Sequence, residues 1–180
     1  MLQNYENPGR KVWHIHVDGA CRGNPGPGGY GGLATTGTEA FEFSGSEKQT
    51  TNNRMELMAA IVALSKLREP GEVHIYTDSQ YVQKGMTEWL PKWQANGWKT
   101  SNGKTVENKG LWIALGTQAR RHAVKWHWVR GHNGDRGNER ADQLARGAIK
   151  QRFAMRGKSG VVSVGQPAMG DHEQFEQKLF

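Results

Sequence analysis

The order of the predicted strands and helices constrains the fold of this chain most. Three extended patterns cover residues 12–18, 30–36 and 39–45. Only short turns separate them, which favours an antiparallel meander. Helical and extended patterns then alternate, with helices predicted over 50–67, 79–90, 111–121 and 138–149 and strands over 72–78 and 123–129. The sequence therefore predicts an α/β fold: a mixed five-stranded sheet, three antiparallel strands and then parallel crossovers, with helices packed on both faces.

The length of 180 residues suits one domain. We expect residues 11–150 to form it, after an N-terminal extension at 1–10. The polar, tryptophan-rich passage 91–110 is expected to interrupt regular structure. Residues 151–180 are predicted to be a largely disordered C-terminal tail, because their stretch "GKSGVVSVGQPAMG" has no helical period and "DHEQFEQKLF" is polar up to its last two residues.

Charge and cysteine content indicate a cytoplasmic protein with a polyanionic partner. The formal net charge is +7 and the pI is about 9.7, which suggests nucleic acid as the partner. No apolar run approaches the roughly 20 residues of a membrane span, and the N-terminus lacks the layout of a secretory signal. A single cysteine, Cys21, permits no internal disulfide and favours a reducing compartment. We expect a monomer without a membrane partner.

The predicted helix over 50–67 carries an acidic residue at the edge of its apolar side. Its apolar face is formed by residues at three- and four-residue steps, namely Leu57, Ala60, Ile61, Leu64 and Leu67. Glu56 lies at the edge of this face, and burying its ionised carboxylate without a partner would cost several kcal/mol. Two explanations remain open: Glu56 reaches water in the first turn after an asparagine cap, or a positive group binds it.

Other carboxylates stand at the ends of predicted elements. Asp18 ends the first strand, and Asp78 ends the fourth strand just before a helix cap. If these strands are neighbours, both residues meet at the edge where open α/β sheets collect their chemistry, and Glu56 can join them. Asp142 lies in the first turn of the last helix. Each of these residues alone would more often be an ordinary turn or cap residue.

A cluster of four carboxylates would need a cation. Mutual repulsion would raise some pKa values until protons or metal ions neutralised the charge. Oxygen-only ligands favour Mg²⁺ or Mn²⁺ over zinc. Two such ions can activate a water and stabilise the leaving oxygen in phosphodiester cleavage. The inward position of Glu56 is then explained by a metal.

Four stretches, in this order along the chain, resemble bacterial ribonuclease HI of the type 1 ribonuclease H family. They are "VDGACRGNPGPGGYGG", "TTNNRMELMAAIVAL", "YTDSQYV" and "WVRGHNGDRGNERADQLA". The resemblance covers about residues 11–150. It implies a ribonuclease H-like fold and endonucleolytic hydrolysis of the RNA strand of RNA–DNA hybrids, giving 5′-phosphate and 3′-hydroxyl ends, in the removal of hybrids and replication primers.

The same resemblance implies roles for single residues. Two Mg²⁺ ions, which Mn²⁺ can replace, would be held by Asp18, Glu56, Asp78 and Asp142. Asp18 would bridge both ions, Glu56 and Asp78 would complete one site, and Asp142 the other. His132 would handle protons and product release, a task that suits an imidazole.

Substrate contacts are also carried over from the family. The RNA minor groove would be contacted by Glu56 and by Gly19, Cys21, Asn24 and Gln80. The DNA strand would be contacted or held by Thr51, Asn52, Asn53 and Asn108. Residues 89–109 match the family's basic protrusion, which grips the DNA strand and begins at Trp89. This chain has "QAN" at 94–96 and Glu107 where well-known members carry a tight cationic cluster, so we expect a weaker electrostatic grip. We expect Trp93 and Trp98 to pack the protrusion rather than bind substrate.

Three other kinds of function fit the sequence less well. A catalytically silent hybrid-binding module would not need four carboxylates beside a polyanion. A DNA-directed nuclease or polynucleotidyl transferase of the same fold would lack the "GNPGPGGYG" and "TNNRMEL" stretches. A zinc site from His14, His16 and His74 is disfavoured, because alternation spaces such residues along a strand. The final Leu179 and Phe180 are similar to peptides that dock on bacterial sliding clamps, although Glu176 replaces the usual glutamine.

Overall fold

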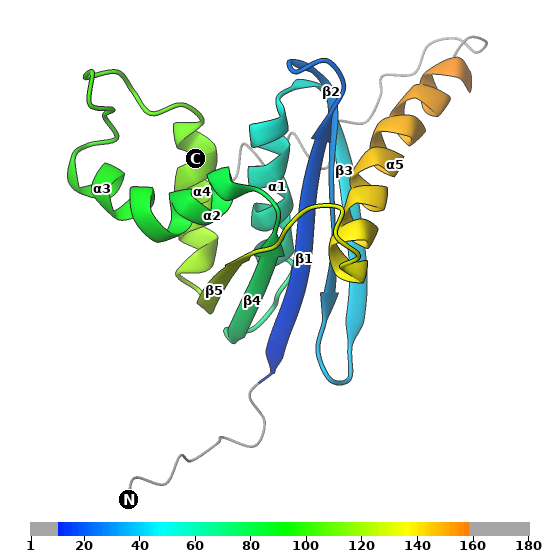
Figure 1. Cartoon of the computed structure of the whole chain (residues 1–180), viewed down its shortest axis with the longest axis horizontal. Coiled ribbons are helices and arrows are strands. Elements are labelled where there is room, and N and C mark those ends of the chain that lie inside the picture. The colour runs from blue at the N-terminus through cyan, green and yellow to red at the C-terminus, as the bar shows by residue number, and fades with distance from the viewer. Residues whose placement is uncertain (1–10, 159–180) are drawn as a thin grey trace, which may run out of the picture.

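The computed structural model describes residues 11–158, which form one five-stranded sheet with helices around it (Figure 1). The strands are β1 (Val12–Cys21), β2 (Gly26–Thr35), β3 (Ala40–Thr50), β4 (Glu72–Thr77) and β5 (Ala123–Trp128). The helices are α1 (Asn52–Ser65), α2 (Gln80–Lys84), α3 (Leu90–Ala95), α4 (Lys109–Ala119) and α5 (Arg136–Lys158), and the π-helical turn η1 (Gly85–Trp89) joins α2 to α3. None of these helices is long and apolar enough to span a bilayer.

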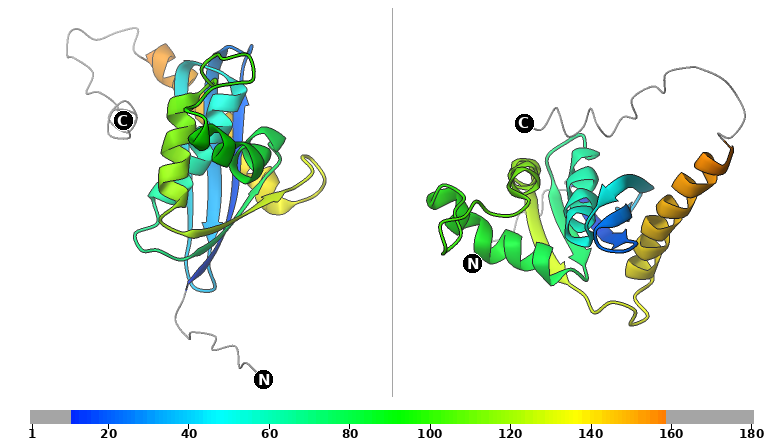
Figure 2. Two further views of the ribbon diagram at one scale, coloured as in Figure 1. Left: turned by 90° about the vertical axis from the view of Figure 1, so that its left-hand side faces the viewer. Right: turned by 90° about the horizontal axis from the view of Figure 1, so that it is seen from above.

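The sheet has the predicted mixed topology. Its strand order is β3-β2-β1-β4-β5. β1, β2 and β3 pair antiparallel, whereas β4 lies parallel to β1 and to β5. α1 packs on one face of the sheet and α5 on the other (Figures 1 and 2). The α/β prediction with helices on both faces is confirmed, and β1 and β4 are neighbours as the active-site hypothesis requires.

Helix α1 is buried on all sides, so the prediction of one apolar face was wrong. Every residue from Met55 to Leu64 is buried. The sheet covers one side of α1 and α4 covers the opposite side, as Figure 2 shows. The cap also differs from the predicted asparagine: Thr51 precedes the helix, and its Oγ1 accepts a hydrogen bond from Arg54 N at 3.3 Å. Glu56 is therefore enclosed by the fold even though it lies in the first turns of the helix.

Regular structure extends further than predicted after β4. Ser79 caps α2 as expected, but the helical path continues through η1 and α3 to Ala95, where an irregular passage was predicted from residue 91. Trp93 lies against Trp98 and Trp112, with ring centroids 6.1 and 5.3 Å apart. This packing confirms the structural role expected for Trp93 and Trp98.

Helix α5 is also longer than predicted. It begins two residues before the predicted start at 138 and continues through Lys158, so the prediction of disorder was wrong for residues 151–158. Gly29 and Gly31 of β2 let α5 approach closely, because a Cβ at either position would overlap Ala145 or Leu144. The predicted N-terminal extension at 1–10, residues 159–180 and the clamp-docking prediction for Leu179 and Phe180 lie outside the described residues.

Candidate active site

The carboxyl ends of β1 and β4 bring two acidic residues together. The parallel pairing of β1 with β4 stops at His16 and Tyr76, and Asp18 and Asp78 follow two residues later on each side. Asp18 was predicted to end the first strand, but β1 continues to Cys21 because it stays paired with β2, so Asp18 lies where the pairing with β4 stops. One carboxylate oxygen from each of Asp18, Glu56 and Asp78 lies within 4.8 Å of the others. In the part of the chain that the structure describes, this is the one group of three or more potential ligands close enough to share a metal ion.

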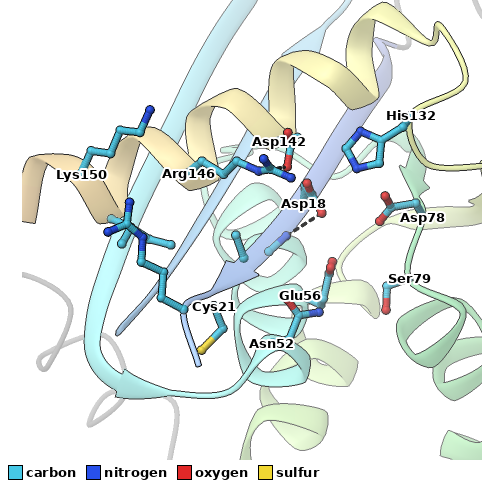
Figure 3. A pocket seen from close by; sticks show the side chains of 14 residues that line it. Asp18, Cys21, Asn52, Glu56, Asp78, Ser79, His132, Asp142, Arg146 and Lys150 are labelled. Carbon is cyan, nitrogen blue, oxygen red and sulfur yellow. Dashed lines mark hydrogen bonds and ion pairs between the residues drawn. The ribbon is translucent and has the colours of Figure 1, made fainter. Parts of the chain in front are cut away.

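Glu56 joins the strand-end residues because β1 and α1 touch at a glycine. A Cβ at Gly19 would overlap the backbone nitrogen of Glu56 and the backbone of Met55. Gly19 N also donates a hydrogen bond to Asp18 Oδ1 at 2.9 Å, which orients that carboxylate (Figure 3). The glycine after Asp18 is thus required by close approach, and it places the first turn of α1 beside the end of β1.

The three carboxylates are in an environment that opposes their charge. Asp18 is 6% exposed and Glu56 is 4% exposed. Burial, followed by the charges of Asp78 and Asp142, raises the pKa of Asp18 to about 7. Burial and then the charges of Asp18 and Asp78 raise the pKa of Glu56 well above its ordinary value. Burial also raises the pKa of Asp78, against a hydrogen bond from Asn138 and the charge of His132.

Glu56 Oε2 is buried without a hydrogen-bond partner among the described residues. A native structure rarely leaves such an atom unpaired, because burying it costs about 1–3 kcal/mol or more. An oxygen-only donor set, raised pKa values and an unpaired inward oxygen are what a hard divalent cation would satisfy. The residues present therefore fit a metal site.

Asp142 and His132 line the same cavity, whose volume is about 640 Å³. Asp142 lies outside the closely spaced group of three, and its Oδ1 accepts a hydrogen bond from Arg146 Nε at 2.8 Å. His132 lies in the loop before α5, with a positive φ of 54°, and projects into the cavity between Asp78 and Asp142 (Figure 3). All five predicted catalytic residues thus surround one cavity.

The predicted substrate residues divide into two groups. Gly19, Cys21 and Asn52 line the cavity. The remaining residues lie outside its lining, namely Asn24, Thr51, Asn53, Gln80, Trp89 and Asn108. Some of these residues have structural contacts: Asn24 Oδ1 accepts a hydrogen bond from Asn52 N at 3.0 Å, and the side chain of Thr51 caps α1.

Trp89 and Asn108 both contact Tyr81. The rings of Trp89 and Tyr81 are 6.1 Å apart, and Asn108 Nδ2 donates a hydrogen bond to the Tyr81 hydroxyl at 3.2 Å. Asn108 immediately precedes α4 with a positive φ of 56°. The two protrusion residues expected to contact DNA are therefore joined through one tyrosine of α2.

The cavity also includes residues that sequence reasoning missed: Ala20, Arg22, Ser79, Arg146, Ile149 and Lys150. Two of them could have been found from spacing. Arg146 and Lys150 follow Asp142 at steps of four, which places them on the same helix face. Arg22 could not be found in this way, because its position depends on how the turn after β1 lies against α5.

The histidines outside the cavity form a separate group across the sheet. His14 stacks on His74 with centroids 5.0 Å apart, and His74 Nδ1 lies 2.8 Å from His127 Nε2. The prediction that alternation would separate these residues considered only one strand, whereas the contacts run between neighbouring strands. The described residues of this group do not form a set of three closely spaced ligands.

Comparison with known proteins agrees with this geometry. The family described as RNase H matches residues 10–150. The chain belongs to the ribonuclease H family. Among similar proteins, one from Cupriavidus necator named ribonuclease H is 56% identical over 136 residues, covering 76% of this chain and 94% of the relative. Another with that name, from Bordetella bronchiseptica, is 54% identical over 153 residues, covering 83% and 97%.

Solved structures of the ribonuclease H family share this fold. LC9-RNase H1, described as a type 1 RNase H with the type 2 active-site motif, superposes with a TM-score of 0.72 at 35% identity, covering 79% of this chain and 74% of that one. LC11-RNase H1, solved in complex with an RNA/DNA hybrid, gives a TM-score of 0.61 at 26% identity, covering 78% and 99%. The fold and the family expected from the four sequence stretches are both confirmed.

Proposed function

We propose that the protein hydrolyses the RNA strand of RNA–DNA hybrids endonucleolytically, leaving 5′-phosphate and 3′-hydroxyl ends. The observation that carries this proposal is the convergence of Asp18, Glu56 and Asp78 within 4.8 Å, in a chain of the ribonuclease H family. A silent hybrid-binding module gains nothing from this cluster, since unneutralised carboxylates would repel the phosphates of the substrate. A DNA-directed nuclease of the same fold is less well supported, because the named relatives are ribonucleases H.

The carboxylates would hold two Mg²⁺ ions, with Mn²⁺ as a substitute. Asp18 would bridge both ions, Glu56 and Asp78 would complete one site, and Asp142 would complete the other. When bound, the ions would activate the attacking water and stabilise charge on the leaving oxygen. The buried oxygen of Glu56 and the raised pKa values of Asp18 and Glu56 support this assignment, because a cation would offset both costs.

His132 would move protons beside this site. It faces the acidic cluster from the loop before α5, and its charge lowers the pKa of Asp78. Its side chain is exposed, so it can pass a proton between the site and solvent. We propose that it assists proton transfer and the departure of product from the metal site.

Short polar groups around the cavity would bind the hybrid. Gly19, Cys21, Asn24, Glu56 and Gln80 would face the RNA strand, where a 2′-hydroxyl distinguishes RNA from DNA. The DNA strand would lie across the α1 start and the protrusion, contacting Thr51, Asn52, Asn53, Trp89 and Asn108. LC11-RNase H1, which has the same fold, was solved with a hybrid and supports this substrate. Primer removal, a monomeric state and a cytoplasmic location remain predictions.

A cleavage assay on matched RNA–DNA, RNA–RNA and DNA–DNA duplexes tests the proposal. With Mg²⁺ we expect cleavage of the RNA strand in the hybrid alone, and none with a chelator. Asp18→Asn should lower turnover by about three orders of magnitude or more, because metal ions contribute several kcal/mol to such barriers. The same variant should still bind the hybrid. Unchanged turnover in Asp18→Asn, or cleavage of DNA duplexes at the same rate, would overturn the assignment.

A further inference from the structure

The cavity has a basic side that the catalytic proposal does not use. Arg22, Arg146 and Lys150 line it together with the four carboxylates. We propose that Arg22 and Lys150, next to Arg146, bind backbone phosphates of the RNA strand beside the scissile bond. This inference rests on the proposed function, since it assigns further contacts to the same substrate.

Helix α5 arranges two of these cations in a row with a catalytic residue. Asp142, Arg146 and Lys150 are spaced at steps of four, so they lie on one face of the helix, about 6 Å apart along its axis. Figure 3 shows Arg146 and then Lys150 leading away from Asp142 along α5. A strand held at the carboxylates would therefore pass the two cations next.

The part of α5 beyond residue 150 holds the third cation. The guanidinium of Arg22 lies over the ring of Phe153, 5.4 Å from its centroid. Arg152 Nη1 donates a hydrogen bond to Ser46 O at 3.3 Å, which ties this turn of α5 to β3. Because the family match ends at residue 150, the contact that positions Arg22 comes from a segment outside the matched region. Phe153 is thus a positioning residue, and Arg22 itself stays exposed while it lies over the Phe153 ring.

These cations are available for phosphate. Neither Arg22 nor Lys150 forms an ion pair with the side chains that the structure describes, and both residues are exposed. Arg146 pairs with Asp142, and its side chain is 60% exposed. Exposed cations beside a phosphodiester site gain affinity chiefly by releasing counterions from the nucleic acid. Arg146 and Lys150 continue along α5 from the carboxylates that we propose act on RNA. We therefore expect these cations to contact the RNA strand rather than the DNA strand.

Hybrid binding in an inactive background tests the proposal. In Asp18→Asn protein with Mg²⁺, the further change Arg22→Ala/Lys150→Ala should weaken binding about tenfold near 100 mM salt. It should also make the slope of log K against log salt shallower by about one to two units, because each lost phosphate contact contributes about 0.9. Phe153→Ala should reproduce part of the Arg22→Ala effect and add little to it. A loss in Phe153→Ala that adds fully to that of Arg22→Ala would contradict the positioning role.

The matched control removes two exposed cations remote from the cavity, Lys66→Ala/Arg68→Ala, and should leave the slope unchanged. If Arg22→Ala/Lys150→Ala leaves the salt slope of the Asp18→Asn parent unchanged, the inference is refuted. Cleavage of the hybrid by protein that carries the Asp18 carboxylate would still support the proposed function in that case. Uncharged methylphosphonates identify the strand. Placed in the RNA strand beside the cleavage site, they should weaken binding of the parent protein but not of Arg22→Ala/Lys150→Ala. The assignment would be overturned if the double variant were insensitive only to methylphosphonates in the DNA strand. It would also be overturned if methylphosphonates in either strand weakened binding of the parent protein and of the double variant equally.

Discussion

Strands β1 and β4 carry two clusters of titratable side chains a few residues apart. Both clusters are partly buried, but they differ in whether the protein itself supplies partners for their polar atoms. The carboxylate cluster is Asp18, Asp78 and Glu56 at the strand ends. The imidazole cluster lies on the same strands before these carboxylates in the sequence, and on β5. It consists of His14, His16, His74, Tyr76 and His127. Its ring nitrogens have partners inside and beside the cluster: His74 Nδ1 lies 2.8 Å from His127 Nε2, His74 Nε2 lies 3.0 Å from Glu72 Oε1, and His16 Nε2 lies 3.4 Å from Asp135 Oδ1.

Burial disfavours the charged form of the side chains in both clusters. Only the imidazoles avoid this cost by losing a proton, because an imidazole is neutral when it is deprotonated. Burial lowers the pKa of His16 and of His127, which favours their neutral form, and His127 can share a proton with His74. The carboxylates are charged when deprotonated, and burial raises the pKa of Asp18 to about 7. The comparison shows that the fold leaves one cluster unsatisfied, at the strand ends where we place the metal ions.

The largest expected effect is on the stability of the metal-free protein. The pKa of Asp18 is raised in the folded state, so its ionisation destabilises the fold as pH rises from about 4 through 7. In chelator, Asp18→Asn should therefore increase the free energy of unfolding by up to about 4 kcal/mol at pH 8 and by little near pH 4. Urea unfolding followed by circular dichroism at both pH values measures this.

The control for this experiment is Glu107→Gln, which neutralises an exposed carboxylate of the protrusion. It should not reproduce the gain in stability at pH 8. Asp18→Asn protein that is no more stable than wild type at pH 8 would contradict the idea that the carboxylate cluster is unsatisfied without a cation.

A smaller effect of opposite pH dependence is expected in the imidazole cluster. Burial, then the charges of His74 and Lys125, lower the pKa of His127 in the folded state. The unfolded chain therefore binds the proton first, and stability is lost as pH falls below about 6.5. His127→Gln keeps a polar partner for His74 and removes the titration.

Between pH 7.5 and 5.5, the free energy of unfolding of His127→Gln should fall less than that of wild type, by about 0.5 kcal/mol, since the group is partly solvated. Urea unfolding curves at the two pH values measure the difference. A steeper or equal fall in the variant would show that His127 does not titrate as a buried imidazole.

Sequence patterns predicted the parts of the fold that depend on local order. Strand alternation placed Asp78 directly after its strand, and the parallel crossover made Asp18 and Asp78 neighbours. Alternation could not predict that β1 continues past Asp18 to Cys21, because those residues pair with β2. Periodicity could not predict that α1 is covered on two sides, because that depends on α4, which lies about 50 residues later in the chain. Nor could it predict α5 beyond residue 150, where contacts of Arg152 and Phe153 with other elements accompany the helix.

In the candidate site, too, the sequence predicted the residues marked by local patterns but not the contacts between distant parts of the chain. Asp18 and His132 were found beside glycines, Asp78 before a helix cap, and Glu56 near the start of α1, all features that the sequence displays. Asp142 was predicted in the first turn of the last helix, but α5 begins at Arg136 and Asp142 lies in its second turn. The Arg22–Phe153 contact and the His74–His127 pair join residues more than 50 positions apart. Their partners are set by packing, which a single sequence does not reveal without an alignment or a fold.

The most direct test of this account is the position of Mn²⁺ in crystals soaked with that ion, found from its anomalous scattering. We expect a peak bound by carboxylate oxygens of Asp18, Glu56 and Asp78, and its loss in Asp18→Asn crystals. A peak at the imidazole cluster with none at the strand-end carboxylates, or no peak at either place, would contradict the account.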